Sequence, residues 1–89
     1  MARYDVQSNV LIEAAAEAGM PDALYELGLM YCSGRGVMLD MIEAHKWFNL
    51  AASRGNEAAR RYRSEIAREL TRREIGEAQR RARAWLSRG

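Results

Sequence analysis

Apolar residues recur along the chain at the spacing of one helix face. Two such stripes consist of Ala59, Tyr62, Ile66 and Leu70, and of Ile75, Ala78, Ala82 and Trp85. Intervals of three and four residues keep the members of each stripe on one side of a helix. No segment alternates between apolar and polar residues over the length of a strand. The pattern therefore predicts an all-α chain.

Glycine and proline predict where the first two helices begin and end. Gly19 ends a first helix of about residues 6–18, and Pro21 opens the second. Proline is tolerated in a first helical turn, because its missing N–H has no helical partner there. Gly34 ends the second helix and Gly36 lies in the turn that follows, since glycine readily adopts positive φ.

Capping residues predict the remaining helices. Asp40 can cap a third helix, which Gly55 ends, and Asn56 can cap a fourth. Thr71 and Glu74 have the spacing of a capping box, so a fifth helix begins directly after Thr71. The sequence thus predicts five helices joined by short turns.

Small residues repeat at a fixed interval. Four pairs are separated by 36 positions: Ala15 and Ala51, Ala16 and Ala52, Gly19 and Gly55, and Ala23 and Ala59. Trp47 finds a counterpart in Trp85, 38 positions later. A helix–turn–helix period of this length is typical of an α-solenoid, in which small residues let neighbouring helices approach closely.

The same residues resemble a Sel-one-like repeat, a relative of the tetratricopeptide repeat. The matching positions are Ala23, Leu27, Gly28, Tyr31, Gly34, Gly36, Val37, Asp40, Ala44, Trp47, Ala51, Ala52 and Gly55. The resemblance implies a short tetratricopeptide-like α-solenoid. It also implies a non-catalytic scaffold for protein–protein interaction. Such repeats commonly hold a peptide or partner protein on the concave face that their first helices line.

The resemblance divides a single domain, residues 1–89, into three parts. Residues 19–55 form a complete repeat, and residues 6–18 resemble only the second helix of a preceding one. Residues 56–88 resemble a degenerate C-terminal capping repeat, with Arg63-Ser64 where the pattern has Leu-Gly. Divergence of this kind is expected of a terminal repeat, whose outer face meets water.

The repeat register predicts which residues line the concave side. On the first complete hairpin they are Asp22, Tyr25, Leu29 and Cys32, and on the next hairpin they are Ala58, Arg61, Glu65 and Arg68. The alternative is that two hairpins form too short an arc for a groove, which would leave these positions as ordinary surface. The sequence leaves both interpretations open.

The charge distribution raises an alternative function. The net charge is +2, but residues 1–59 carry −4 and residues 60–89 carry +6. The arginine-rich C-terminal helices could bind nucleic acid or another polyanion as a basic accessory module. Glutamates interleave with the arginines, and Glu69–Arg73 and Glu77–Arg81 have ion-pair spacing on a helix. The sequence therefore favours a solvated surface, and a protein or peptide partner over nucleic acid.

The residues with chemical potential do not combine into a reactive site. The glycines around Arg35 lack the further glycine or the Gly-Lys-Ser/Thr of phosphate loops. A single cysteine, Cys32, excludes an internal disulfide and a cysteine-based zinc cluster. Cys32 and the only histidine, His45, could approach each other on adjacent helices, but nothing supplies an orienting group or an oxyanion hole. We expect no catalysis, no metal and no cofactor.

Two expectations concern the surroundings of the protein. No apolar run resembles a signal peptide or a membrane span, which predicts a soluble cytoplasmic protein and is also compatible with the periplasm. The first helix lacks a hairpin partner and carries Val6, Val10, Leu11 and Ile12. Either it packs wholly onto the next two helices, or its outer side mediates self-association or docking.

Overall fold

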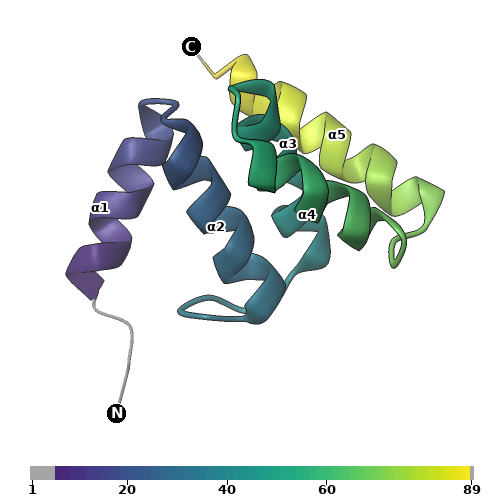
Figure 1. Ribbon diagram of the computed structural model, residues 1–89, viewed down its shortest axis with the longest axis horizontal. Coiled ribbons are helices and arrows are strands. Elements are labelled where there is room, and N and C mark those ends of the chain that lie inside the picture. The colour runs from purple at the N-terminus through teal and green to yellow at the C-terminus, as the bar shows by residue number, and fades with distance from the viewer. Residues whose placement is uncertain (1–5, 89) are drawn as a thin grey trace.

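The computed structural model describes the backbone of residues 6–88 and the side chains of residues 10–88. This part of the chain contains five helices and no strand, and Figure 1 shows their arrangement. They are α1 (Val6–Glu17), α2 (Pro21–Ser33), α3 (Met41–Ser53), α4 (Glu57–Ala67) and α5 (Arg72–Leu86). The prediction of an all-α chain with five helices is confirmed.

Side-chain caps begin the last three helices as predicted. The Asp40 carboxylate accepts the N–H groups of Ile42 and Glu43, each at 3.1 Å. At the start of α4, the Asn56 side chain accepts the Ala59 N–H at 2.8 Å. A reciprocal capping box between the residues at positions 71 and 74 opens α5. These bonds satisfy backbone donors that have no partner within a helix.

Glycines with positive φ follow the first three helices. Gly34 directly follows α2 with φ 71°, and its N–H donates to the Met30 carbonyl. Gly19 and Gly55 have φ 81° and 103° and stand two residues after the last residues of α1 and α3. The predicted boundaries therefore hold to within two residues, because they depend on local backbone conformation.

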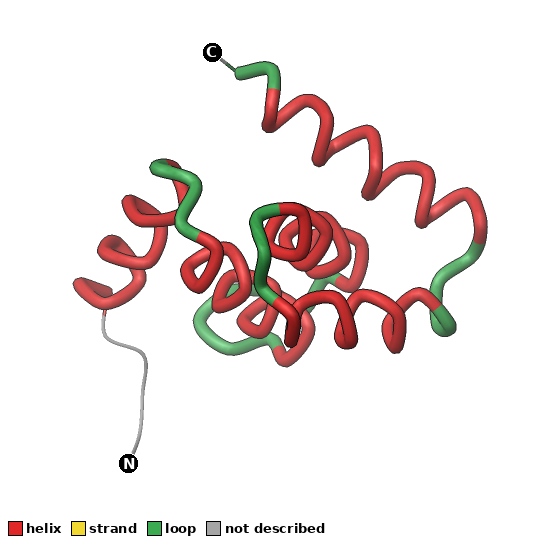
Figure 2. Tube along the Cα trace, turned by 45° about the horizontal axis from the view of Figure 1, so that its top comes forward, coloured by secondary structure: helices red, strands yellow, loops and turns green. Residues whose placement is uncertain are grey.

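Helix α3 is the centre of the molecule. It packs against α2, α4 and α5, whereas α1 packs mainly against α2. Figures 1 and 2 both show α1 on one side of the central helices and α5 on the other. The largest fully buried side chains are Leu24 and Met30 of α2 and Phe48 and Leu50 of α3. The core therefore lies mainly at the α2–α3 interface.

Gly28 allows α2 and α3 to approach each other. A Cβ atom added at Gly28 would lie 2.5 Å from Cδ1 and Cε1 of the Phe48 ring. The ring is fully buried, so it has little room to move aside. Gly28 therefore leaves the space that the Phe48 ring occupies between the two helices.

We expect Gly28→Ala to lower the free energy of unfolding by roughly 1–2 kcal/mol, because overpacking costs more than the gain in helix propensity. Urea denaturation measures this change. Gly76→Ala in α5 is the matched control, since its Cβ would meet only the flexible end of Arg80 at 3.6 Å. Equal stability of the two variants would contradict a steric role for the Phe48 ring.

Candidate functional site

The first helices of the two hairpins place four polar and aromatic residues close together. We define the α2–α4 surface as Asp22 and Tyr25 of α2 with Arg61 and Tyr62 of α4. Asp22 accepts a hydrogen bond from Asn56 Nδ2, at the start of α4, at 3.1 Å. The centroids of the Tyr25 and Tyr62 rings are 5.9 Å apart. The α2–α4 surface is therefore a tyrosine pair between charged side chains.

Phe48 contacts both tyrosines of the pair. The centroid of its ring lies 5.3 Å from that of Tyr62, on which it stacks, and 5.9 Å from that of Tyr25. Burial, together with Tyr62 and Glu26, raises the pKa of Tyr25, and Arg61 opposes this effect. Tyr25 therefore presents a neutral phenol, held in place by ring contacts on two helices.

Tyr62 is a member of this surface that the sequence did not assign. It belongs to an apolar stripe, which predicts a core position, yet 38% of the residue is exposed. The sequence feature that could have assigned Tyr62 to this surface is its separation from Tyr25. The two tyrosines are 37 positions apart, one more than the repeat interval. The structure places Tyr25 against Tyr62 and near Arg61.

The other predicted groove residues contribute less to the α2–α4 surface. Leu29 and Cys32 are half-buried and pack against the core. Glu65 and Arg68 are exposed, and within residues 10–88 neither forms an ion pair or hydrogen bond with α2. Ala58 is half-buried. The binding role of these residues stays a prediction.

Cys32 and His45 do not provide an activated nucleophile. Burial raises the pKa of the Cys32 thiol, and its S–H donates to the Leu29 carbonyl at 3.5 Å. His45 is only 4% exposed, and no described residue bonds to its Nδ1 atom. Burial, and then the positive charge of Arg63, lowers the pKa of His45. The thiol and the imidazole are therefore both held in their neutral forms.

A neutral buried imidazole makes stability depend on pH. Below about pH 6.5 the unfolded chain protonates His45, whereas the folded chain resists protonation, so stability falls as the pH is lowered towards the folded pKa. His45 is the only histidine of the chain. We expect the melting temperature to fall between pH 7 and pH 5.5, and His45→Gln to flatten this dependence. An equally steep dependence in the variant would assign the effect to other groups.

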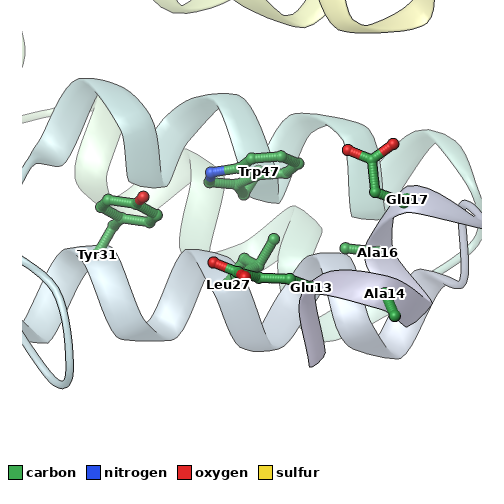
Figure 3. Close-up of a pocket in the computed structure, with 7 residues that line it drawn as sticks. All are labelled: Glu13, Ala14, Ala16, Glu17, Leu27, Tyr31 and Trp47. Atoms are coloured by element: carbon green, nitrogen blue, oxygen red, sulfur yellow. The ribbon is translucent and has the colours of Figure 1, made fainter. Parts of the chain in front are cut away.

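A second candidate site lies between α1, α2 and α3. A cavity of about 320 Å³ is bordered by seven residues, shown in Figure 3: Glu13, Ala14, Ala16, Glu17, Leu27, Tyr31 and Trp47. We call it the α1–α3 cavity. Tyr31 and Trp47 are positions of the repeat pattern, whereas the sequence assigns no role to the two glutamates. Their charge alone is equally typical of a solvated helix face.

Trp47 joins this region to α5. The rings of Trp47 and Trp85 meet edge to face at 5.9 Å, and the Trp47 indole N–H donates to Glu43 at 3.2 Å. Glu43 also accepts a hydrogen bond from Arg81 of α5 at 3.0 Å. Aromatic and charged contacts therefore fix α5 on α3. They explain the recurrence of tryptophan at an interval of 38 residues.

The C-terminal arginines divide into paired and unpaired groups. Arg80 and Arg81 both pair with Glu77, at 2.8 and 2.9 Å, which confirms the predicted pair within α5. The predicted pair between Glu69 and Arg73 is wrong, because the chain leaves the helix after residue 67 and α5 begins only at residue 72. Six exposed arginines between residues 60 and 88 have no ion pair with any described residue: Arg60, Arg61, Arg68, Arg72, Arg73 and Arg83.

The described residues contain no group of three histidine, cysteine, aspartate or glutamate side chains placed to hold a metal ion. Likewise, none of the helices α1–α5 is both long and apolar enough to cross a membrane.

The Sel1 repeat family model matches residues 21–56. The match covers α2, α3 and the residue that caps α4. It confirms the resemblance seen in the sequence and agrees with the tetratricopeptide-like helical fold. No curated protein matches the chain. Sel1 repeats are generally protein–protein interaction modules and are typically non-catalytic.

Proposed function

We propose that this chain, in which residues 21–56 form a Sel1 repeat, is a non-catalytic scaffold that binds a protein or peptide partner on the α2–α4 surface. In this proposal residues 6–18 act as the second helix of a preceding repeat, and residues 56–88 act as a C-terminal capping repeat. The whole chain then works as a single interaction domain.

The observation that carries the proposal is the fixed tyrosine pair. Tyrosines are frequent binding anchors, because they offer a large contact area and a polar hydroxyl with few rotatable bonds. Tyr25 and Tyr62 rest on the fully buried Phe48 ring, so binding would cost little further side-chain entropy. Asp22 and Arg61 provide charges of both signs beside them. This arrangement suits a polar peptide with an apolar or aromatic anchor.

Two observations support the non-catalytic part of the proposal. Burial raises the pKa of Cys32, which disfavours the reactive thiolate. His45 is buried and its pKa is lowered, so it is not placed to accept a proton from solvent-exposed substrate.

Arg61→Glu tests the binding surface directly. We expect it to reduce capture of the partner from the native lysate by about fivefold or more, the effect of losing about 1 kcal/mol of binding free energy. Quantitative mass spectrometry of the captured proteins measures this. Arg60→Glu is the matched control, since it makes the same charge change at the neighbouring exposed position. Both variants should keep the parental melting temperature.

The outcome of this experiment separates the two candidate functions. Equal loss of capture in both variants, together with salt-sensitive retention of the parent on heparin, would favour polyanion binding instead. The six exposed C-terminal arginines without ion pairs are the observation behind that second function. Tyr25→Ala is less suitable as a test, because Tyr25 also contacts Phe48 and its loss would lower stability.

We also propose that α1 docks onto another molecule or a second copy of the chain. Val10 and Leu11 are 55% and 67% exposed, and α1 packs mainly on α2. Val6 lies outside the residues whose side chains are described. We expect Leu11→Lys to lower the molar mass measured by light scattering at high protein concentration, because apolar contact area is lost. A parental protein that is monomeric at every concentration would contradict self-association.

A further inference from the structure

The α1–α3 cavity is lined by apolar and aromatic side chains on one side, here called its floor, and by Glu13 and Glu17 of α1 on the other. Leu27, Tyr31 and Trp47 come from the α2–α3 hairpin and form the floor. Figure 3 shows the Glu13 carboxylate of α1 beside Leu27, whereas the Glu17 carboxylate points away from Leu27 and Tyr31. The volume of the cavity, about 320 Å³, lies at the lower end of the range for ligand pockets.

The negative charge of the carboxylates at the cavity favours binding of a cation. Burial, followed by the negative charges of Glu43, Glu13 and Asp40, raises the pKa of Tyr31 at its edge. Glu13 forms no ion pair with any residue from 10 to 88, whereas Glu17 is paired with Arg88 at 3.1 Å. A cation entering the cavity would therefore find Glu13 available. The Tyr31 ring would attract the same cation through its π face, as the Trp47 ring already does for the Lys46 ammonium, which lies 4.0 Å from its centroid.

Arg88 shows how a guanidinium can bind a tryptophan ring and a glutamate carboxylate in this protein. Arg88 places its guanidinium 3.5 Å from the centroid of the Trp85 ring and donates to the Glu17 carboxylate. Tryptophan and glutamate thus already hold one guanidinium at the rim of the cavity. Because a guanidinium is planar, it can stack on a ring while its N–H groups bond a carboxylate.

We propose that the α1–α3 cavity is a second binding site, which accepts an arginine side chain of a partner protein segment. Glu13 receives the guanidinium, Tyr31 contacts its flat face, and Leu27 and Trp47 contact the side-chain methylenes. This site does not depend on the α2–α4 surface. It uses other residues and selects a different chemistry, so either proposal can fail without the other.

The test uses an N-acetylated, C-amidated Ala-Arg-Ala tripeptide as the probe. The tripeptide is titrated into the ¹⁵N-labelled full chain. The indole N–H signals of the two tryptophans of the protein, Trp47 and Trp85, are followed by NMR. We expect a saturable shift of the Trp47 signal together with backbone signals of α1. The tripeptide with citrulline in place of arginine should produce no such shift, since citrulline keeps the shape and loses the charge.

Variants of two glutamates complete the test. Glu13→Gln should weaken tripeptide binding roughly tenfold, the loss expected for one charge-assisted hydrogen bond. Glu57→Gln is the matched control, because Glu57 is exposed in the first turn of α4, away from the cavity. Both substitutions replace exposed side chains and should leave the fold and the melting temperature unchanged.

Several results would overturn the proposal. Equal binding of the citrulline tripeptide would exclude recognition of charge, and equal binding of a lysine tripeptide would exclude selection of a guanidinium. Free arginine that binds as tightly as the tripeptide would indicate a small-molecule site. Shifts confined to residues near Tyr25 and Tyr62 would assign the peptide to the α2–α4 surface. Unchanged affinity in Glu13→Gln would remove Glu13 from the site.

Discussion

The structure depends on the contact between Gly28 of α2 and the Phe48 ring of α3. Phe48 occupies the space that a side chain at position 28 would need, so the two helices approach closely and bury the core between them. The same ring contacts Tyr25 and stacks on Tyr62, which sets the position of α4 relative to α2. One close helix contact thus determines the geometry of the α2–α4 surface.

Two consecutive residues of α3, Trp47 and Phe48, make contacts on different sides of the helix. Phe48 supports the tyrosine pair, while Trp47 meets Trp85 of α5 and borders the α1–α3 cavity. Successive residues on a helix point about 100° apart, so neighbouring aromatic residues face different partners. A central helix with apolar residues on several sides can therefore pack against α2, α4 and α5 and support two candidate binding sites.

The sequence predicts what depends on local chemistry and misses what depends on long-range packing. Helix ends at Asp40 and Gly34 were predictable, because caps and positive φ involve only neighbouring residues. The exposure of Tyr62 was not predictable, because periodicity assigns a residue to a helix face but does not say how far a neighbouring helix covers that residue. The Glu69–Arg73 pair failed for a related reason, because the spacing rule assumes an uninterrupted helix. The cavity required the placement of α1, which no local pattern specifies.

The attachment of α1 governs the α1–α3 cavity. Its carboxylates come from α1, whereas its floor comes from the α2–α3 hairpin. Helix α1 is held mainly by α2, with a further link at its C-terminal end, where Arg88 bonds the side chain and the carbonyl oxygen of Glu17. That link is partly exposed, and exposed ion pairs contribute little to stability. A partner that covers Val10 and Leu11 would add contacts to α1, the helix that carries the carboxylates at the cavity.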